Sequence, residues 1–134
     1  MLVEVNNIVY ESLKEYISNL ENNYGNEILK VPPKNKCFPH TLFRTITDIQ
    51  TDNNCRGKKS TKGYRIDIFA QDRKGMLRVD IAEKIFEQIN YFMCDIVGLE
   101  QQGYASFDVG NNSETTQITV TYVGTLDEFR VRFI

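Results

Sequence analysis

An uninterrupted apolar stripe in the second half of the chain constrains the fold more than any other feature. Apolar residues recur there at steps of three and four, which is the spacing of one α-helical face. The stripe consists of Leu77, Ile81, Ile85, Ile89 and Phe92, with Ala82 and Phe86 beside it. Because no charged residue interrupts this face, we expect it to be buried. The pattern predicts that Gly75 to Asn90 is the central packing helix, with Ile81, Ile85 and Ile89 as its buried stripe.

Segments on both sides of this helix alternate apolar and polar residues with a period of two, the pattern of a half-buried strand. Tyr64 to Ala70 precedes the helix, and Thr115 to Val123 follows it. His40 to Gln50 mixes β-branched and aromatic residues, which favours a strand. Tyr104 to Val109 is a shorter candidate. The chain therefore contains at least four predicted strands.

The N-terminal segment has its own helical stripe, which runs from Val5 to Leu20 and ends at the asparagines and glycine of Glu21 to Gly25. Pro32 and Pro33 then favour an extended connection. The element order is α-β-β-α-β-β, with a further edge strand or arm at Phe129 to Ile134. This order predicts an α+β fold in a single domain of residues 1–134. A largely antiparallel sheet of about four to five strands packs against two amphipathic helices.

The segment Thr51 to Gly63 has two glycines, four cations and no apolar period. That composition is typical of a mobile loop, here joining two antiparallel strands. Its cations, Arg56, Lys58, Lys59 and Lys62, are candidates for a surface that faces a neighbouring subunit or DNA. No aromatic residues are interleaved with them to stack on bases, which argues against a nucleic-acid site.

Composition restricts the function further. Sixteen basic and eighteen acidic residues give a net charge of −2, so the whole molecule is not attracted to nucleic acid or anionic lipid. Cys37, Cys55 and Cys94 are an odd, widely spaced set with His40 as the sole histidine. We expect three free thiols rather than a disulfide framework or a zinc site. No export signal or membrane-spanning run is visible, which predicts a cytosolic protein.

Signatures of catalysis are lacking as well. Gly57 to Ser60 superficially resembles the end of a phosphate-binding loop, but Asp52 stands where that loop needs its first glycine. No nucleophile lies at a recognisable spacing from His40. Carboxylates such as Asp80 and Glu83 have the spacing of a solvated helix face. We therefore expect no catalytic residues, no cofactor and no metal, and a protein that is not an enzyme.

Taken together, the segments resemble the tail terminator, or tail completion, proteins of long-tailed bacteriophages. Those proteins open with a helix and pass through a proline-containing stretch into a strand, here Val31 to Phe43. After a variable loop they continue with an alternating strand and an amphipathic helix, here Tyr64 to Ala70 and Gly75 to Asn90. Their last hairpin ends in a turn similar to Tyr122 to Asp127.

The resemblance implies a structural virion protein that forms a hexameric ring at the head-proximal end of the tail. Such a ring ends polymerisation of the tail tube and provides the surface on which the head docks. It carries no cofactor, and its partners are the tail tube protein and the head-tail connector proteins. DNA passes through the ring in transit. The protein would be found in the virion, and in the host cytoplasm during assembly.

The residues also suggest an oligomer independently of the resemblance, because several strands carry apolar side chains on both faces and offer more apolar surface than one side of a sheet can bury. We predict an inter-subunit edge at Phe129, Val131 and Phe133. Two alternatives stay open. One is another head-tail connector or minor virion protein, and the other is a small cytosolic DNA-binding module that uses the basic loop 56–62.

Overall fold

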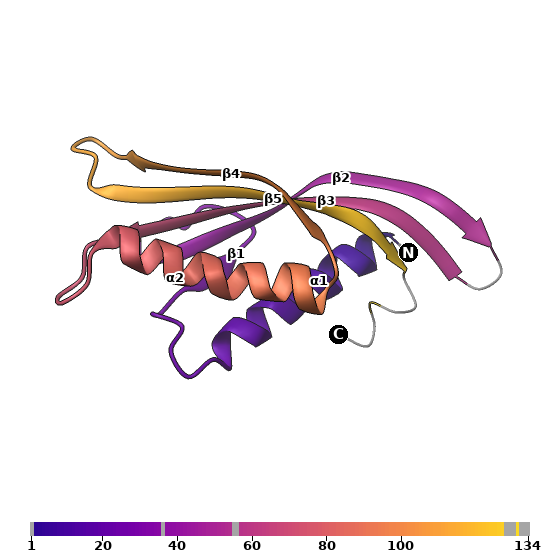
Figure 1. The fold of residues 1–134 in the computed structure, drawn as a ribbon, viewed down its shortest axis with the longest axis horizontal. Coiled ribbons are helices and arrows are strands. Elements are labelled where there is room, and N and C mark those ends of the chain that lie inside the picture. The colour runs from indigo at the N-terminus through magenta and orange to yellow at the C-terminus, as the bar shows by residue number, and fades with distance from the viewer. Residues whose placement is uncertain (1, 36, 55–56, 128–130, 132–134) are drawn as a thin grey trace.

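A computed structural model describes residues 2–35, 37–54, 57–127 and 131. It has one five-stranded sheet, and both helices lie on the same face of it (Figure 1). The elements in chain order are α1 (Leu2–Ser18), β1 (Glu27–Leu29), β2 (His40–Asn54), β3 (Gly57–Gln71), α2 (Arg78–Asn90), the π-helix η1 (Tyr91–Ile96), β4 (Glu100–Val109) and β5 (Thr115–Asp127). The strand order is β1-β2-β3-β5-β4. The predicted α+β class is confirmed.

Every strand pair in the sheet is antiparallel except β1 with β2. The short β1 strand was not predicted, because three residues after a turn carry no detectable periodicity. Glu27 pairs with His40 and Leu29 pairs with Leu42, so β1 covers the first part of the β2 edge. The rest of β2 has no partner on that side among the described residues.

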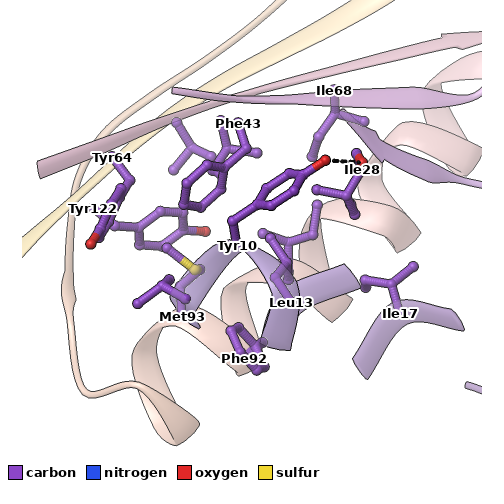
Figure 2. Packing of buried hydrophobic residues seen from close by; sticks show 14 of the residues in the cluster. Tyr10, Leu13, Ile17, Ile28, Phe43, Tyr64, Ile68, Phe92, Met93 and Tyr122 are labelled. Carbon is purple, nitrogen blue, oxygen red and sulfur yellow. Dashed lines mark hydrogen bonds between the residues drawn. The ribbon is translucent and has the colours of Figure 1, made fainter. Parts of the chain in front are cut away.

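The hydrophobic core lies between the helices and the sheet (Figure 2). Ile81, Ile85 and Ile89 of α2 are each 0% exposed, which confirms the predicted buried stripe. They lie in one cluster with the inward-facing residues of β3 and β5. The predicted stripe on α1 also faces this cluster, and its fully buried members are Val5, Val9, Leu13 and Ile17.

Leu77 departs from the predicted stripe, since 65% of it is exposed. Helix α2 begins at Arg78 rather than Gly75, and Leu77 has extended backbone angles at the cap position. A side chain at that position does not lie on the helical face. The helix predicted from the periodicity therefore began too early, at Gly75. At the other end, Phe92 and Met93 stay buried because the chain continues directly from α2 into η1.

Three core tyrosines join the layers through their hydroxyl groups. Tyr10 donates to the backbone oxygen of Ile28 at 3.0 Å, as Figure 2 shows. Tyr64 of β3 donates to Asn6 of α1 at 2.7 Å, and Tyr122 of β5 donates to Asn90 at 3.0 Å. Burial, with a smaller contribution from Cys94, raises the pKa of Tyr122, so its hydroxyl remains a hydrogen-bond donor. Buried tyrosine hydroxyls usually have such a partner.

The prediction of a mobile loop at Thr51 to Gly63 was wrong for the residues that the structure describes. Strand β2 runs to Asn54 and β3 begins at Gly57, and in Figure 1 this hairpin extends past the helices. The backbone of β3 also pairs with β5 here, from Lys59 with Asp127 to Gly63 with Val123. Pairing on both sides of a strand outweighs a weak local β-propensity, which depends strongly on context.

Candidate assembly surfaces

The three predicted loop cations that the structure describes belong to a strand rather than to a loop. Lys62 lies within β3 and is 0% exposed, so it cannot contact DNA or a neighbour from this conformation. Lys58 and Lys59 also belong to β3, where their backbones pair with Asn53 and Asp52. Arg56 lies outside the described residues. Lys62 is therefore excluded from the predicted group of four contact cations.

The sheet has two long edges that carry no strand among the described residues. Strand β4 is the terminal strand on one side, and all of its residues except Gly103 and Val109 are exposed. On the opposite side, β2 is covered by β1 only as far as Leu42. Unpaired N–H and C=O groups on an edge are ready to pair with another chain. Natural edges are often protected by lysine or proline, and β4 contains neither.

The predicted inter-subunit edge at the C-terminus is only partly described. Val131 is 3% exposed and belongs to the hydrophobic core of the same subunit. Its apolar side chain is therefore satisfied internally, and in this conformation it is not available to a neighbour. Phe129 and Phe133 lie outside the described residues. Among the described residues, the edges of β2 and β4 are therefore better suited than Val131 to pair with a neighbouring subunit.

A charged cluster lies on the sheet face opposite the helices. Asp67 of β3 belongs to that face, yet it is only 1% exposed. Its chain neighbours Ile66 and Ile68 point to the other face, into the core, because successive side chains of a strand alternate between the two faces. Its Oδ1 accepts hydrogen bonds from Thr119 at 2.7 Å and from Gln117 at 3.3 Å. Two polar side chains of β5 thus fix this carboxylate, and arginines of β2 and β3 cover it.

Arg65 and Arg44 both pair with the Asp67 carboxylate. The Nε of Arg65 lies 3.3 Å from Oδ1, to which it donates, and 3.2 Å from Oδ2. Arg44 reaches Oδ2 only at 3.8 Å, and Oδ2 has no well-aligned hydrogen bond among the described residues. Sequence periodicity places Arg65 and Asp67 on one strand face, but it could not reveal Arg44, whose position depends on the β2–β3 register.

Replacing Asp67 by asparagine should lower the free energy of unfolding by about 1.5–3 kcal/mol, the range for hydrogen bonds to a charged group. The substitution preserves shape but leaves two guanidinium groups side by side without their shared anion. We place the effect below that of a fully buried ion pair because both arginines are about half exposed. Urea denaturation measures it. Asp95→Asn, at an exposed position, is the control and should change stability by less than about 0.5 kcal/mol.

His40 is part of the packing. It is 7% exposed, its Nδ1 lies 2.8 Å from the backbone oxygen of Cys37, and its ring stacks on Phe69 with centroids 5.0 Å apart.

Within the described part of the chain, no group of three or more His, Cys, Asp or Glu residues could hold a metal ion. None of the described helices is long and apolar enough to cross a membrane.

Cys37 and Cys94 are both unpaired, in agreement with the predicted free thiols, whereas Cys55 lies outside the described residues. The two environments differ. Cys37 is exposed. Cys94 is partly buried, and burial, together with the nearby Asp95 carboxylate, raises the pKa of its thiol despite a backbone hydrogen bond at Gln101 that lowers it.

We therefore expect Cys94 to react with a thiol reagent at least about tenfold more slowly than Cys37 at pH 8, because the thiolate is the reactive species. Single-cysteine variants, with the other two cysteines replaced by serine, would be followed by absorbance. In denaturant the two rates should become equal. A native Cys94 that reacts as fast as Cys37 would contradict this assignment.

No family model matches the chain, and no curated protein matches it. Solved structures do match. One is a chain from the virion of a native gene transfer agent (GTA) particle, with a TM-score of 0.55 and 12% sequence identity. The match covers 91% of this chain and 93% of that chain. Over nearly its whole length, the chain has a fold similar to that of a protein from this virion.

Proposed function

We propose that this chain is a structural subunit of a phage-like virion, in which six copies close into a ring at the head-proximal end of the tail. The ring ends growth of the tail tube and forms the surface on which the head docks. The observation that carries the proposal is a pair of edges that have no partner strand in the described part of the chain, β2 beyond Leu42 and β4, on opposite sides of one sheet. The fold similarity to a GTA virion protein supports the coarser part of the proposal, a structural role in a virion.

Strand direction supports this mode of assembly. Strands β2 and β3, β3 and β5, and β5 and β4 are each antiparallel pairs, so β2 and β4 run in opposite directions. If β4 of one subunit lies beside β2 of the next, the new pair is antiparallel as well. Each subunit then extends the same ladder by four strands, and main-chain hydrogen bonds form the contact.

Such a head-to-tail contact between different edges either closes into a ring or continues without limit. Closure requires a sheet that is twisted and curved. Strand β2 has two register irregularities, between Thr45 and Thr47 and between Gln50 and Asp52. Bulges of this kind bend a strand and increase its twist. A closed ring is also what a protein that stops a tube from growing requires.

In this arrangement the neighbours along the tail axis are the tail tube protein on one side and head-tail connector proteins on the other. The DNA crosses the ring as it leaves the head. The role requires no catalysis and no cofactor. The protein is synthesised in the host cytoplasm and remains in the virion.

A second candidate, another head-tail connector or minor virion protein, is favoured equally by the fold similarity, which extends over 91% of the chain without specifying a position in the particle. The DNA-binding module is less well supported, because Lys62 of its proposed contact loop is fully buried.

Labelling of assembled particles tests the proposal. Virions that contain this chain would be labelled with a gold-conjugated antibody against it and imaged after tails and heads have been separated. Terminator function predicts label at the head-proximal end of free tails and none along the tube. Label on the head vertex would favour the connector alternative, and label elsewhere in the particle would favour a minor component.

A further inference from the structure

The sheet face opposite the helices holds two arginines that are direct cross-strand neighbours, Arg44 of β2 and Arg65 of β3. Like charges in this position are unfavourable. One buried carboxylate, Asp67, is ion-paired to both. Since two guanidinium groups share one carboxylate, the cluster has a surplus of one positive charge.

Apart from Asp67, the cluster's own row and the row of Asp67 contain no acidic residue that could neutralise that surplus, and in the row on the other side Glu100 of β4 lies opposite Val123, two strands away from β3. In register with Arg44 and Arg65 lie Thr121 of β5 and Gly103 of β4. The row that contains Asp67 continues through Leu42 and Thr119, so these adjacent positions are uncharged. The arginine side chains are 51% and 44% exposed. A guanidinium has five N–H donors, and the cluster therefore keeps donors directed at solvent.

The cluster is also held in place before any partner arrives. Arg65 is anchored through Nε on Asp67, and Asp67 is fixed by Thr119 and Gln117 from the neighbouring β5 strand. All these side chains project from paired strands. Ordering a site of this kind on binding costs little conformational entropy, which favours recognition of an oxyanion.

Apolar groups near the cluster indicate which oxyanion. Phe69 lies four residues after Arg65 on β3 and on the same sheet face. It pairs with Gln117 of β5, which pairs in turn with Phe107 of β4. Phe107 is 44% exposed. Phe69 itself is half-buried and stacked on His40. Aromatic residues and arginine on one face are characteristic of protein interfaces. Duplex DNA needs several phosphate-neutralising cations for affinity, and this cluster offers a surplus of one.

We propose that this face, defined by Arg44, Arg65, Phe69 and Phe107, is a docking surface for a protein segment that presents a carboxylate and an aromatic side chain. The carboxylate binds the two guanidinium groups, and the aromatic side chain packs near Phe69 and Phe107. At roughly 3.3 Å per residue, the two contacts are separated by about 13 Å, or four residues of an extended segment. The open edges of the sheet remain available for ring formation.

The test uses the isolated protein and a capped five-residue probe, Ac-Glu-Thr-Ser-Thr-Phe-NH2, with a second peptide in which glutamine replaces the glutamate. Binding is followed by NMR through the arginine Nε–H signals and the Thr121 amide. We expect the glutamate peptide to bind at least about fivefold more tightly than the glutamine peptide. Equal affinities would overturn the proposal.

Arg65→Gln should abolish the difference between the two peptides, and Arg44→Gln provides a second variant should the first fail to fold. The matched control is Lys84→Gln, which removes one positive charge from an exposed side chain on α2. If Lys84→Gln reduced the difference in affinity between the two peptides as much as the arginine variants do, long-range attraction of the glutamate by the net charge would explain the binding, and the proposal would be overturned. Displacement of the peptide by a 12-base-pair duplex at lower concentration would also overturn it, in favour of nucleic acid. Because only the single subunit is used, these results do not depend on ring formation.

Discussion

Replacing Ile85 by alanine is expected to lower the free energy of unfolding by roughly 2 to 5 kcal/mol, the range for emptying a packed aliphatic site. Ile85 is 0% exposed and lies at the middle of α2, between Ile81 and Ile89. The core cluster includes residues of both helices and of the strands on the facing side, so the surrounding atoms cannot easily collapse into the cavity. Urea denaturation followed by circular dichroism gives the difference.

The matched control for this prediction is Glu83→Ala. Glu83 is exposed on the same helix, and alanine is a favourable helix former, so its stability should stay within about 0.5 kcal/mol of the original chain. If Ile85→Ala were as mild as Glu83→Ala, α2 would not pack against the sheet in solution as described.

The parts of the fold that the sequence predicted are those with strong periodicity. Ile81, Ile85 and Ile89 repeat along a helical face, and Tyr64 to Ala70 alternates along a strand, so burial of one face determines the element in each case. The antiparallel sheet followed from the number and order of such segments.

Features that depend on tertiary pairing were out of reach. Thr51 to Gly63 has the local composition of a loop, yet the described part of it forms strands because β3 pairs with both β2 and β5. The burial of Lys62 is a consequence of that pairing. The Arg44 and Arg65 neighbours arise from register, which no single segment encodes.

Adding lysine to both faces of the β4 edge is expected to reduce ring formation by at least about tenfold. Ala105 and Ser106 are exposed and successive, so the double variant Ala105→Lys/Ser106→Lys places one cation on each side of the edge. Edge lysines prevent another strand from approaching because their charge would have to be desolvated. The fold should be retained, with a melting temperature within about 3 °C. Ring formation is measured by incorporation into tails isolated without this protein.

The control adds the same charge outside the edge. Asn111→Lys/Asn112→Lys places two lysines in the exposed turn between β4 and β5. This variant should join tails as the original chain does. If both double variants fail equally, charge rather than edge pairing is responsible. If neither fails, β4 is not the contact.

Cryo-electron microscopy of virions that contain this chain would show directly whether the subunits form this ring. We expect a closed ring of six copies at the head-proximal end of the tail, in which β4 of each subunit lies antiparallel beside β2 of the next. A ring at that position joined through the helices would refute the edge-pairing mechanism. The absence of this chain from the head-proximal end, with its presence elsewhere in the particle, would contradict the terminator function itself.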